Sequence, residues 1–250
     1  MYSDRGRIGA IVLDSDITVE PEFRMMAPPG VEVFATRVAA PHDLPKPEYL
    51  RALCDQVRPA VRVLLATRPS AVVFCCTSAS FLGGPGWDER LCEDMRTEAG
   101  AVPVTTPSTG IGAALRQLGL RRLVVGTPYL PEINERLRSY LTSRGYDVLR
   151  LDRIYRGPGD SVDEDLKMAS VPPAEMRDFM IGLDRPEADG VLISCTALPA
   201  AAHVAEVEAK LGKPVVTSNL AAMWHALTIS GIGTIRKGFG KLGATLDEQD

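Results

Sequence analysis

The sequence predicts an α/β protein built from two pseudosymmetric halves, each with a doubly wound, Rossmann-like parallel sheet, and with the active site in the cleft between them. Apolar, β-branched runs alternate with helical patterns from end to end, which is typical of parallel sheets covered by helices. Two segments, AVVFCCTSAS at 71–80 and GVLISCTALP at 190–199, each contain an apolar run that ends in a Cys-Thr pair followed by small residues. After each of them comes a strand pattern that ends in hydroxyl residues and leads into an Ala-rich helix. These matches indicate an internal duplication.

The elements follow one another in the same order in both halves. Short apolar runs bounded by polar or small residues predict strands at 7–13, 31–38, 71–76, 102–105, 122–126, 147–151, 190–195 and 214–217. Helical spacing predicts helices at 46–66, 88–99, 107–118, 130–144, 173–183, 199–211 and 219–229. The first half is expected to span residues 1–118, with a C-terminal segment at about 218–250 crossing back to it, and to carry Cys76. The second half is expected to span 119–217 and to carry Cys195.

Composition excludes several classes of function. The chain has 250 residues, 45% of them hydrophobic and 24% charged, with a net charge of −4, and no long basic tract, so nucleic acid is not an expected partner. No apolar run approaches the roughly 20 residues that span a bilayer, and the N-terminus lacks a signal-peptide pattern. A cytoplasmic location without membrane association is therefore expected. The five cysteines and three histidines show no ligand spacing, and no metal site or disulfide framework is expected.

Cys76 and Cys195 are the strongest candidates for chemistry. Ligands of α/β proteins bind at the carboxyl ends of parallel strands, where both thiols fall. Buried cysteines often serve only as small packing residues, but the matched Cys-Thr context favours a functional pair. Cys75 points to the opposite face of its strand, and Cys54 and Cys92 fall within helical patterns, so these three are expected to pack in the core.

Two thiols that face each other across one substrate suit proton transfer at carbon, or addition to an activated double bond, with no metal or cofactor. The hydroxyls that are expected to bind a carboxylate and its enolate-like form belong to Thr77, Ser78, Thr109 and Thr196. Helix N-capping is the alternative role for each, and both roles can coexist. Tyr129 lies at a strand end and is either a further donor to the carboxylate or a packing residue.

The remaining polar candidates are expected to be structural. His203 and His225 fall in helical patterns and are expected to be helix residues rather than bases. The acidic run at 160–165 is expected to be a solvated loop.

The chain resembles the aspartate/glutamate racemase superfamily, in the branch that contains maleate cis-trans isomerase and arylmalonate decarboxylase. The resemblance covers almost the whole chain. Its motifs are IVLDSDITVEPEF (11–23), VVFCCTSASFLGG (72–84), PVTTPSTGIGAAL (103–115), VVGTPYLPEINERL (124–137), ISCTALP (193–199) and PVVTSNLAAMWHAL (214–227). It implies a fold of two pseudosymmetric α/β halves with the active site between them.

The resemblance also implies roles for single residues. In the maleate isomerase-like pattern, Cys76 is the nucleophile that adds to the double bond, Cys195 is the acid/base partner, and Tyr129 binds the substrate carboxylate. The decarboxylase-like branch keeps only the second cysteine. The presence of both therefore favours a cis-trans isomerase or a racemase.

One departure from the family pattern bears on the substrate. Asp16 stands where maleate isomerase-like sequences have Asn, and Asp165 falls at a second family Asn. An amide donates a hydrogen bond to a carboxylate, whereas an ionised Asp repels it. A dianion such as maleate is thereby disfavoured, and a substrate with an amino, amide or other donor group near one end is expected. An Asp in the first loop also resembles relatives linked to ectoine utilisation.

The sequence thus predicts a cofactor-independent, two-cysteine isomerase that acts on a small carboxylic acid. The enzymatic alternatives are an amino-acid-type racemase, an ectoine-utilisation-related enzyme and an arylmalonate decarboxylase-like decarboxylase. A metabolite-binding module that uses the same cleft is the non-enzymatic alternative. The expected partners are a small-molecule carboxylate and further copies of the chain in a homo-oligomer.

Overall fold

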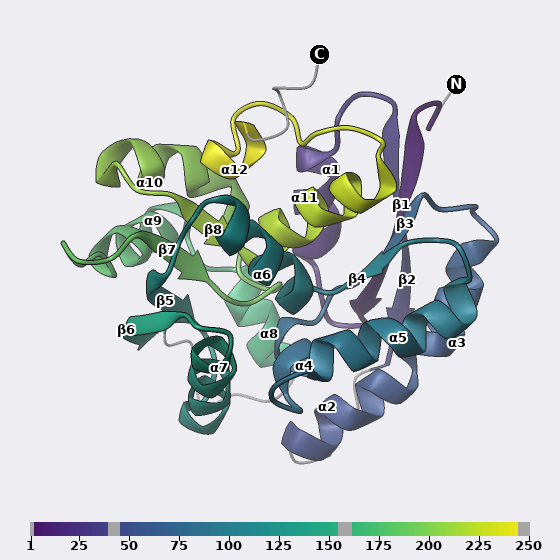
Figure 1. The fold of residues 1–250 in the computed structure, drawn as a ribbon, viewed down its shortest axis with the longest axis horizontal. Coiled ribbons are helices and arrows are strands. Elements are labelled where there is room, and N and C mark those ends of the chain that lie inside the picture. Colours follow the sequence, from purple (N-terminus) through teal and green to yellow (C-terminus); the bar gives the residue numbers. More distant parts are fainter. Residues whose placement is uncertain (1–2, 40–45, 155–161, 245–250) are drawn as a thin grey trace.

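Two parallel sheets of four strands each form the framework of the molecule (Figure 1). The computed structural model describes residues 3–39, 46–154 and 162–244. The first sheet has the order β2-β1-β3-β4 and the second β6-β5-β7-β8, so both repeat the same topology. The strands are β1 (Gly6–Leu13), β2 (Val31–Val38), β3 (Ala71–Phe74), β4 (Val104–Thr105), β5 (Arg122–Thr127), β6 (Asp147–Arg153), β7 (Gly190–Ile193) and β8 (Val215–Thr217). The predicted fold class is confirmed, and each predicted strand is present with slightly different ends.

The strands that precede the two cysteines occupy equivalent places in their sheets. β3 lies between β1 and β4, and β7 lies between β5 and β8, with parallel pairing throughout. All residues of β3 and β7 are buried, as apolar runs covered on both faces should be. Each Cys-Thr pair therefore follows the carboxyl end of an interior strand, at the equivalent place in its sheet.

Helices cover the sheets. They are α1 (Val19–Met26), α2 (Lys46–Asp55), α3 (Val57–Leu65), α4 (Thr77–Phe81), α5 (Trp87–Ala99), α6 (Pro107–Gln117), α7 (Pro131–Ser143), α8 (Val162–Ala169), α9 (Pro173–Gly182), α10 (Val204–Leu211), α11 (Ser218–Ser230) and α12 (Gly240–Ala244), with a 3-10 turn at Ala201–His203. The prediction of a loop at 160–165 was wrong in part, because α8 begins at Val162.

The single helix predicted at 46–66 is two helices, α2 and α3. Pro59 lacks the N–H group that would bond across the junction, and it is tolerated because it falls in the first turn of α3. At the junction, the Gln56 side chain bonds the backbone of Ala39 instead, accepting from its N–H at 3.1 Å and donating to its carbonyl at 2.8 Å. These bonds fix the break between the two helices.

Helix α11, which follows the second sheet in sequence, packs closely on α6, and the two lie side by side in Figure 1. A Cβ atom added to Gly110 of α6 would lie 2.8 Å from the carbonyl oxygen of Ala221, so only glycine permits this approach. α11 also contacts β3 and α1, which belong to or flank the first sheet. The division of the chain at residues 118 and 218 stays a prediction.

Candidate active site

Cys76 and Cys195 both follow an interior strand directly. β3 ends at Phe74, and Cys76 has extended backbone and is the N-cap residue of α4. β7 ends at Ile193, and Cys195 follows after one residue. The Cys76 side chain is buried, while Cys195 is half-buried. The chain thus turns out of each strand at the thiol, which points the two thiols to the carboxyl edge of their sheets.

The two strand ends lie against each other. Thr196 Oγ1 donates a hydrogen bond of 3.3 Å to the carbonyl oxygen of Cys75, across 121 positions of sequence. Thr18 Oγ1 donates in the same way to the carbonyl oxygen of Ala197, at 3.0 Å. The loops that follow β1, β3 and β7 are therefore joined by direct hydrogen bonds at one place in the fold.

The Tyr129 hydroxyl is close enough to both thiols to interact with them electrostatically. Burial raises the pKa of Tyr129 well above its usual range, and the nearby Cys195 and Cys76 thiols raise it further. The hydroxyl also lies beside Ser194 and Thr77, but its geometry makes a hydrogen bond to neither, and the buried Ser194 Oγ also lacks a partner. Buried hydroxyls are nearly always hydrogen-bonded in folded proteins. Two such groups beside two thiols indicate a place where a ligand supplies the acceptor.

Local structure holds Tyr129 in this position. Its backbone N–H donates to Thr127 Oγ1 at 3.2 Å, and its carbonyl oxygen accepts from Asn134 Nδ2 at 3.2 Å. Thr127 Oγ1 in turn donates to Asn134 Oδ1 at 2.6 Å. The edge of the Phe81 ring packs on the Tyr129 ring, with 5.9 Å between centroids. The strand end of β5 and the first turn of α7 together fix the ring.

The four hydroxyl residues that the sequence singled out differ in their contacts. Ser78 Oγ lies 3.8 Å from Cys76 Sγ, and Thr77 Oγ1 donates to Ser218 Oγ at 3.0 Å. Thr196 holds the loop of Cys75, as described above. Thr109 is engaged elsewhere, because its backbone N–H is capped by Thr106 Oγ1 and its hydroxyl donates to Asp88. Thr106, rather than Thr109, is therefore the N-cap residue of α6.

Asp16 is buried and serves as a helix cap. Its Oδ1 accepts hydrogen bonds from the backbone N–H groups of Thr18 and Val19, at 2.9 and 2.8 Å, at the start of α1. Asp16 also lies near Glu22 and Cys75: burial is the main cause of the raised pKa of both groups, and the Asp16 carboxylate raises it further. The side chain of Asp165 lies outside the described residues.

Three residues at this place were not predicted: Glu22, Ser194 and Asn219. Glu22 lies on the apolar face of α1 with Val19, Phe23 and Met26, at helical spacing. An acidic residue on such a face signals a buried, partnered carboxylate, and this signal was available in the sequence. Ser194 and Asn219 carry no comparable signal, because hydroxyl and amide residues are common at strand ends and in first turns of helices.

The other cysteines and histidines among the described residues have structural surroundings. Burial raises the pKa of Cys54 to about 12 and raises that of Cys75 and Cys92 as well, which keeps these thiols protonated at neutral pH. His225 bonds Thr105 Oγ1 at 2.7 Å, and burial lowers its pKa to about 4. Burial also lowers the pKa of His203.

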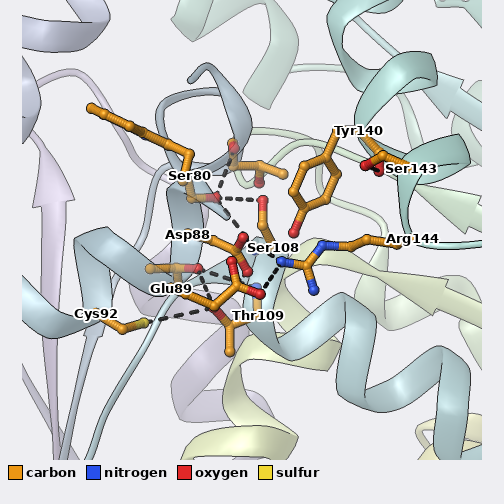
Figure 2. A network of polar contacts seen from close by, with 12 residues as sticks. Ser80, Asp88, Glu89, Cys92, Ser108, Thr109, Tyr140, Ser143 and Arg144 are labelled. Atoms are coloured by element: carbon orange, nitrogen blue, oxygen red, sulfur yellow. Dashed lines mark hydrogen bonds and ion pairs between the residues drawn. The ribbon is translucent and has the colours of Figure 1, made fainter. Parts of the chain in front are cut away.

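A polar network behind α4 supports the helix that begins after Cys76. Ser80 Oγ of α4 donates to the Thr77 carbonyl oxygen at 2.8 Å and lies 2.6 Å from Ser108 Oγ of α6. Figure 2 shows Ser80 beside Ser108. In the same view, Arg144 at the end of α7 donates to Asp88 of α5, at 2.6 Å, and to Glu89. The network thereby ties elements beside the first sheet to a helix of the second.

Two findings concern the whole of the described chain. Among residues 3–39, 46–154 and 162–244, no three His, Cys, Asp or Glu side chains are grouped to hold a metal ion. In the same ranges, no helix has both the length and the apolar character needed to cross a membrane.

The duplicated sheets and the two strand-end cysteines place the chain in a class of enzymes. Comparison with known proteins identifies this class as the aspartate/glutamate racemase superfamily. The family model described as arylmalonate decarboxylase matches residues 8–243. The chain belongs to this family, and the resemblance expected from the sequence motifs is confirmed.

Individual relatives extend the comparison. Arylmalonate decarboxylase from Bordetella bronchiseptica is 34% identical over 199 residues, covering 78% of this chain and 80% of the relative. A maleate isomerase from Nocardia farcinica is 25% identical over 243 residues, covering 94% of each. A solved arylmalonate decarboxylase variant in its liganded form superposes with a TM-score of 0.85 at 30% identity, over 97% of this chain and 99% of that one. The fold is therefore that of both kinds of relative.

Proposed function

We propose that the chain is a cofactor-independent isomerase of a small carboxylic acid, in which Cys76 is the nucleophile and Cys195 the acid/base partner. The observation that carries the proposal is the buried Tyr129 hydroxyl, which interacts electrostatically with both thiols and makes no hydrogen bond of normal geometry within the described residues. A ligand carboxylate that accepts from this hydroxyl would lie next to both sulfur atoms. Each thiol comes from the equivalent strand end of its sheet, which supports a reaction on two sides of one substrate.

The proposed reaction balances with the two thiols alone. The Cys76 thiolate forms an S–C bond to one carbon of a double bond conjugated to a carboxylate, and the π electrons move into an enolate. The Cys195 thiol protonates the neighbouring carbon, which leaves a C–C single bond that can rotate. Cys195 then takes back a proton, the double bond re-forms and the S–C bond breaks. Both sulfur atoms return to their starting states.

Hydroxyl groups around the thiols would bind the carboxylate and its enolate-like form. Tyr129 and Ser194 offer buried O–H donors without protein partners, and Ser78 Oγ lies near the Cys76 sulfur. Thr77 and Thr196 border the same place through their bonds to Ser218 and Cys75. Donors fixed before the reaction stabilise developing negative charge without rearrangement, which favours enolate formation.

The relatives support isomerase and decarboxylase chemistry to different degrees. The matching family model and the 34% identical relative are named for arylmalonate decarboxylase, which makes a decarboxylase the second candidate. Relatives named maleate isomerase match over more of the chain, and a solved Nocardia farcinica variant holds a covalently bound succinylcysteine intermediate. The presence of two strand-end cysteines favours the isomerase, since the decarboxylase-like pattern retains only the second.

The substrate class follows from Asp16. One oxygen of this buried carboxylate caps α1, so its charge stays close to the loops that surround the thiols. A negative charge there disfavours a second substrate carboxylate and favours an amino or amide donor. We propose an unsaturated or amino-acid-type monocarboxylate rather than maleate. Homo-oligomer formation and a cytoplasmic location stay predictions.

The first test removes each thiol in turn. A panel of unsaturated, amino and N-acyl acids is incubated with the protein in deuterated water, and isomerisation and deuterium at carbon are followed by NMR. We expect Cys76→Ala and Cys195→Ala each to lower turnover by about 10²–10⁴-fold, since each removes a reacting group.

Cys54→Ala is the matched control, because this thiol lies near Cys76 but its raised pKa keeps it protonated. It should retain turnover, and circular dichroism should show that all three variants fold. Unchanged turnover in Cys76→Ala, with loss in Cys195→Ala, would contradict the two-thiol isomerase and favour the decarboxylase-like use of Cys195 alone.

A further inference from the structure

Glu22 bonds two residues that lie 179 and 197 positions away from it in sequence. It lies on α1 and is only 5% exposed. Its Oε1 accepts a hydrogen bond from the backbone N–H of Ala201 at 2.8 Å, and its Oε2 accepts one from Asn219 Nδ2 at 2.7 Å. Ala201 follows the loop of Cys195, and Asn219 lies in the first turn of α11. The Glu22 carboxylate therefore bonds both the end of the Cys195 loop and the start of α11.

Asn219 transmits this contact to the residue next to Cys195. Its Nδ2 donates a second hydrogen bond, of 2.9 Å, to the carbonyl oxygen of Thr196. Both N–H groups of the amide are used, and its Oδ1 is buried without a hydrogen-bond partner. The amide can hold the Thr196 carbonyl only while Nδ2 faces Glu22, and a carboxylate without a proton enforces that orientation.

Burial and the charged groups near Glu22 let its carboxyl group gain or lose a proton near neutral pH. Burial raises the pKa of Glu22 to about 7, and the Asp16 carboxylate raises it further against the bonds to Asn219 and Ala201. On β2, which packs against α1, Arg37 is engaged with Glu20 and with the carbonyl oxygens of Leu13 and Asp16. On α11, His225 is bonded to Thr105.

We infer that Glu22 is a positioning residue, whose ionised carboxylate fixes the Cys195–Ala201 loop through Asn219 and so sets the place of the second thiol. The inference rests on the proposed acid/base role of Cys195. When Glu22 takes up a proton on Oε2, that O–H needs an acceptor, and the buried Asn219 Oδ1 is the one at hand. Turning the amide to supply it removes the donor from the Thr196 carbonyl oxygen.

The test compares the two thiols directly. Glu22→Gln places an N–H donor opposite Asn219 and forces the same turn of the amide at every pH. Asn219→Ala removes the donor to Thr196 by a second route, should Glu22→Gln fail to fold. Glu20→Gln is the matched control, because Glu20 lies on the same helix in surface ion pairs with Arg24 and Arg37.

The measured quantity is the ratio of iodoacetamide labelling rates at Cys195 and Cys76, followed by mass spectrometry of the two peptides. We expect Glu22→Gln and Asn219→Ala to raise this ratio about threefold or more at about pH 8, because the loop of Cys195 opens more often. Wild-type protein should approach the Glu22→Gln ratio as the pH falls to about 5.5, where its own Glu22 is protonated. Turnover should fall about 10- to 100-fold through kcat, with KM changed less than about twofold.

Several outcomes would overturn the inference. The first is an equal change in the labelling rates of Cys76 and Cys195. The second is the same change of the labelling ratio in Glu20→Gln. The third is a wild-type ratio that stays different from that of Glu22→Gln at every pH. The labelling ratio needs no substrate, so it stands apart from the proposed function. Full turnover in Cys76→Ala would refute the two-thiol reaction while a Cys195-selective labelling change still established the positioning role.

Discussion

The buried carboxyl group of Glu22 lowers the stability of the fold at neutral pH, while its hydrogen bonds position Ala201 and Asn219. A carboxyl group whose pKa is about 7 in the folded protein, against 4.5 ordinarily, binds a proton in the folded state that the unfolded chain has already released. The folded state is thus favoured below about pH 4.5, and this advantage is lost as the pH rises to about 7. Because the ionised carboxylate destabilises the fold at neutral pH, its bonds to Ala201 and Asn219 indicate a role other than stability.

This linkage gives a prediction about stability. Between about pH 5 and about pH 8, the free energy of unfolding of the wild type should fall by about 2–3 kcal/mol relative to Glu22→Gln, which has no proton to release. Urea unfolding at both pH values measures the difference. The Glu20→Gln variant should show no such trend relative to wild type, and parallel curves for wild type and Glu22→Gln would contradict the assigned direction of the shift.

At the scale of elements, the contact between α6 and α11 depends on one missing side chain. A Cβ on Gly110 would lie 2.8 Å from Ala221 O and 3.2 Å from Ala222 Cα, both in the backbone of α11. Backbone atoms cannot rotate away as side chains can, so the two helices would have to separate. This contact also sets the start of α11, where Ser218 and Asn219 reach the two strand-end loops.

Gly110→Ala should therefore destabilise the protein by about 1–3 kcal/mol, despite the higher helix propensity of alanine. Gly112→Ala is the control on the same helix, because its Cβ would meet only the side-chain ends of Arg116, at 3.4 Å, and Arg144, at 3.9 Å. That variant should be neutral or more stable by up to about 1 kcal/mol. Thermal or urea unfolding compares the two, and equal effects would show that the close approach to α11 does not limit the fold.

At the scale of the whole molecule, a buried ion pair crosses between elements of the two sheets. Asp88 of α5 has a side chain that is 1% exposed, and it accepts from Arg144 at the end of α7. Thr109 of α6 donates to its second oxygen at 3.1 Å, and the Arg144 guanidinium stacks on Tyr140 at 4.8 Å. The same network continues through Ser108 to Ser80 of α4 (Figure 2).

Removing the guanidinium should leave a buried carboxylate without its cation. We expect Arg144→Met to lower the free energy of unfolding by about 3–5 kcal/mol. Arg62→Met breaks a surface ion pair to Glu98, in which the arginine side chain is 71% exposed, and should lower it by no more than about 1 kcal/mol. Urea unfolding distinguishes the two, and equal losses would show that the Asp88 pair is not a buried link between the two sheets.

Much of this architecture was predictable from the chain. The alternation of apolar runs predicted the strands of both sheets and the duplicated order, because a strand covered on both faces must be apolar throughout. The break at Gln56 and the helices α1, α4, α8 and α12 were missed. Helices of five to eight residues show little periodicity, and a junction depends on tertiary hydrogen bonds. The matching strand ends also identified Cys76 and Cys195 as candidates.

The sequence by itself determined the fold class, the family and the two strand-end thiols, since each is encoded in local patterns of residues. Only the tertiary structure decided which polar groups gather around them. Glu22 lies far in sequence from Ser194 and Asn219, and the roles of all three depend on which buried donors and acceptors find partners. Hydrogen bonds across more than a hundred residues leave no local trace in a sequence, because either partner alone is an ordinary polar residue.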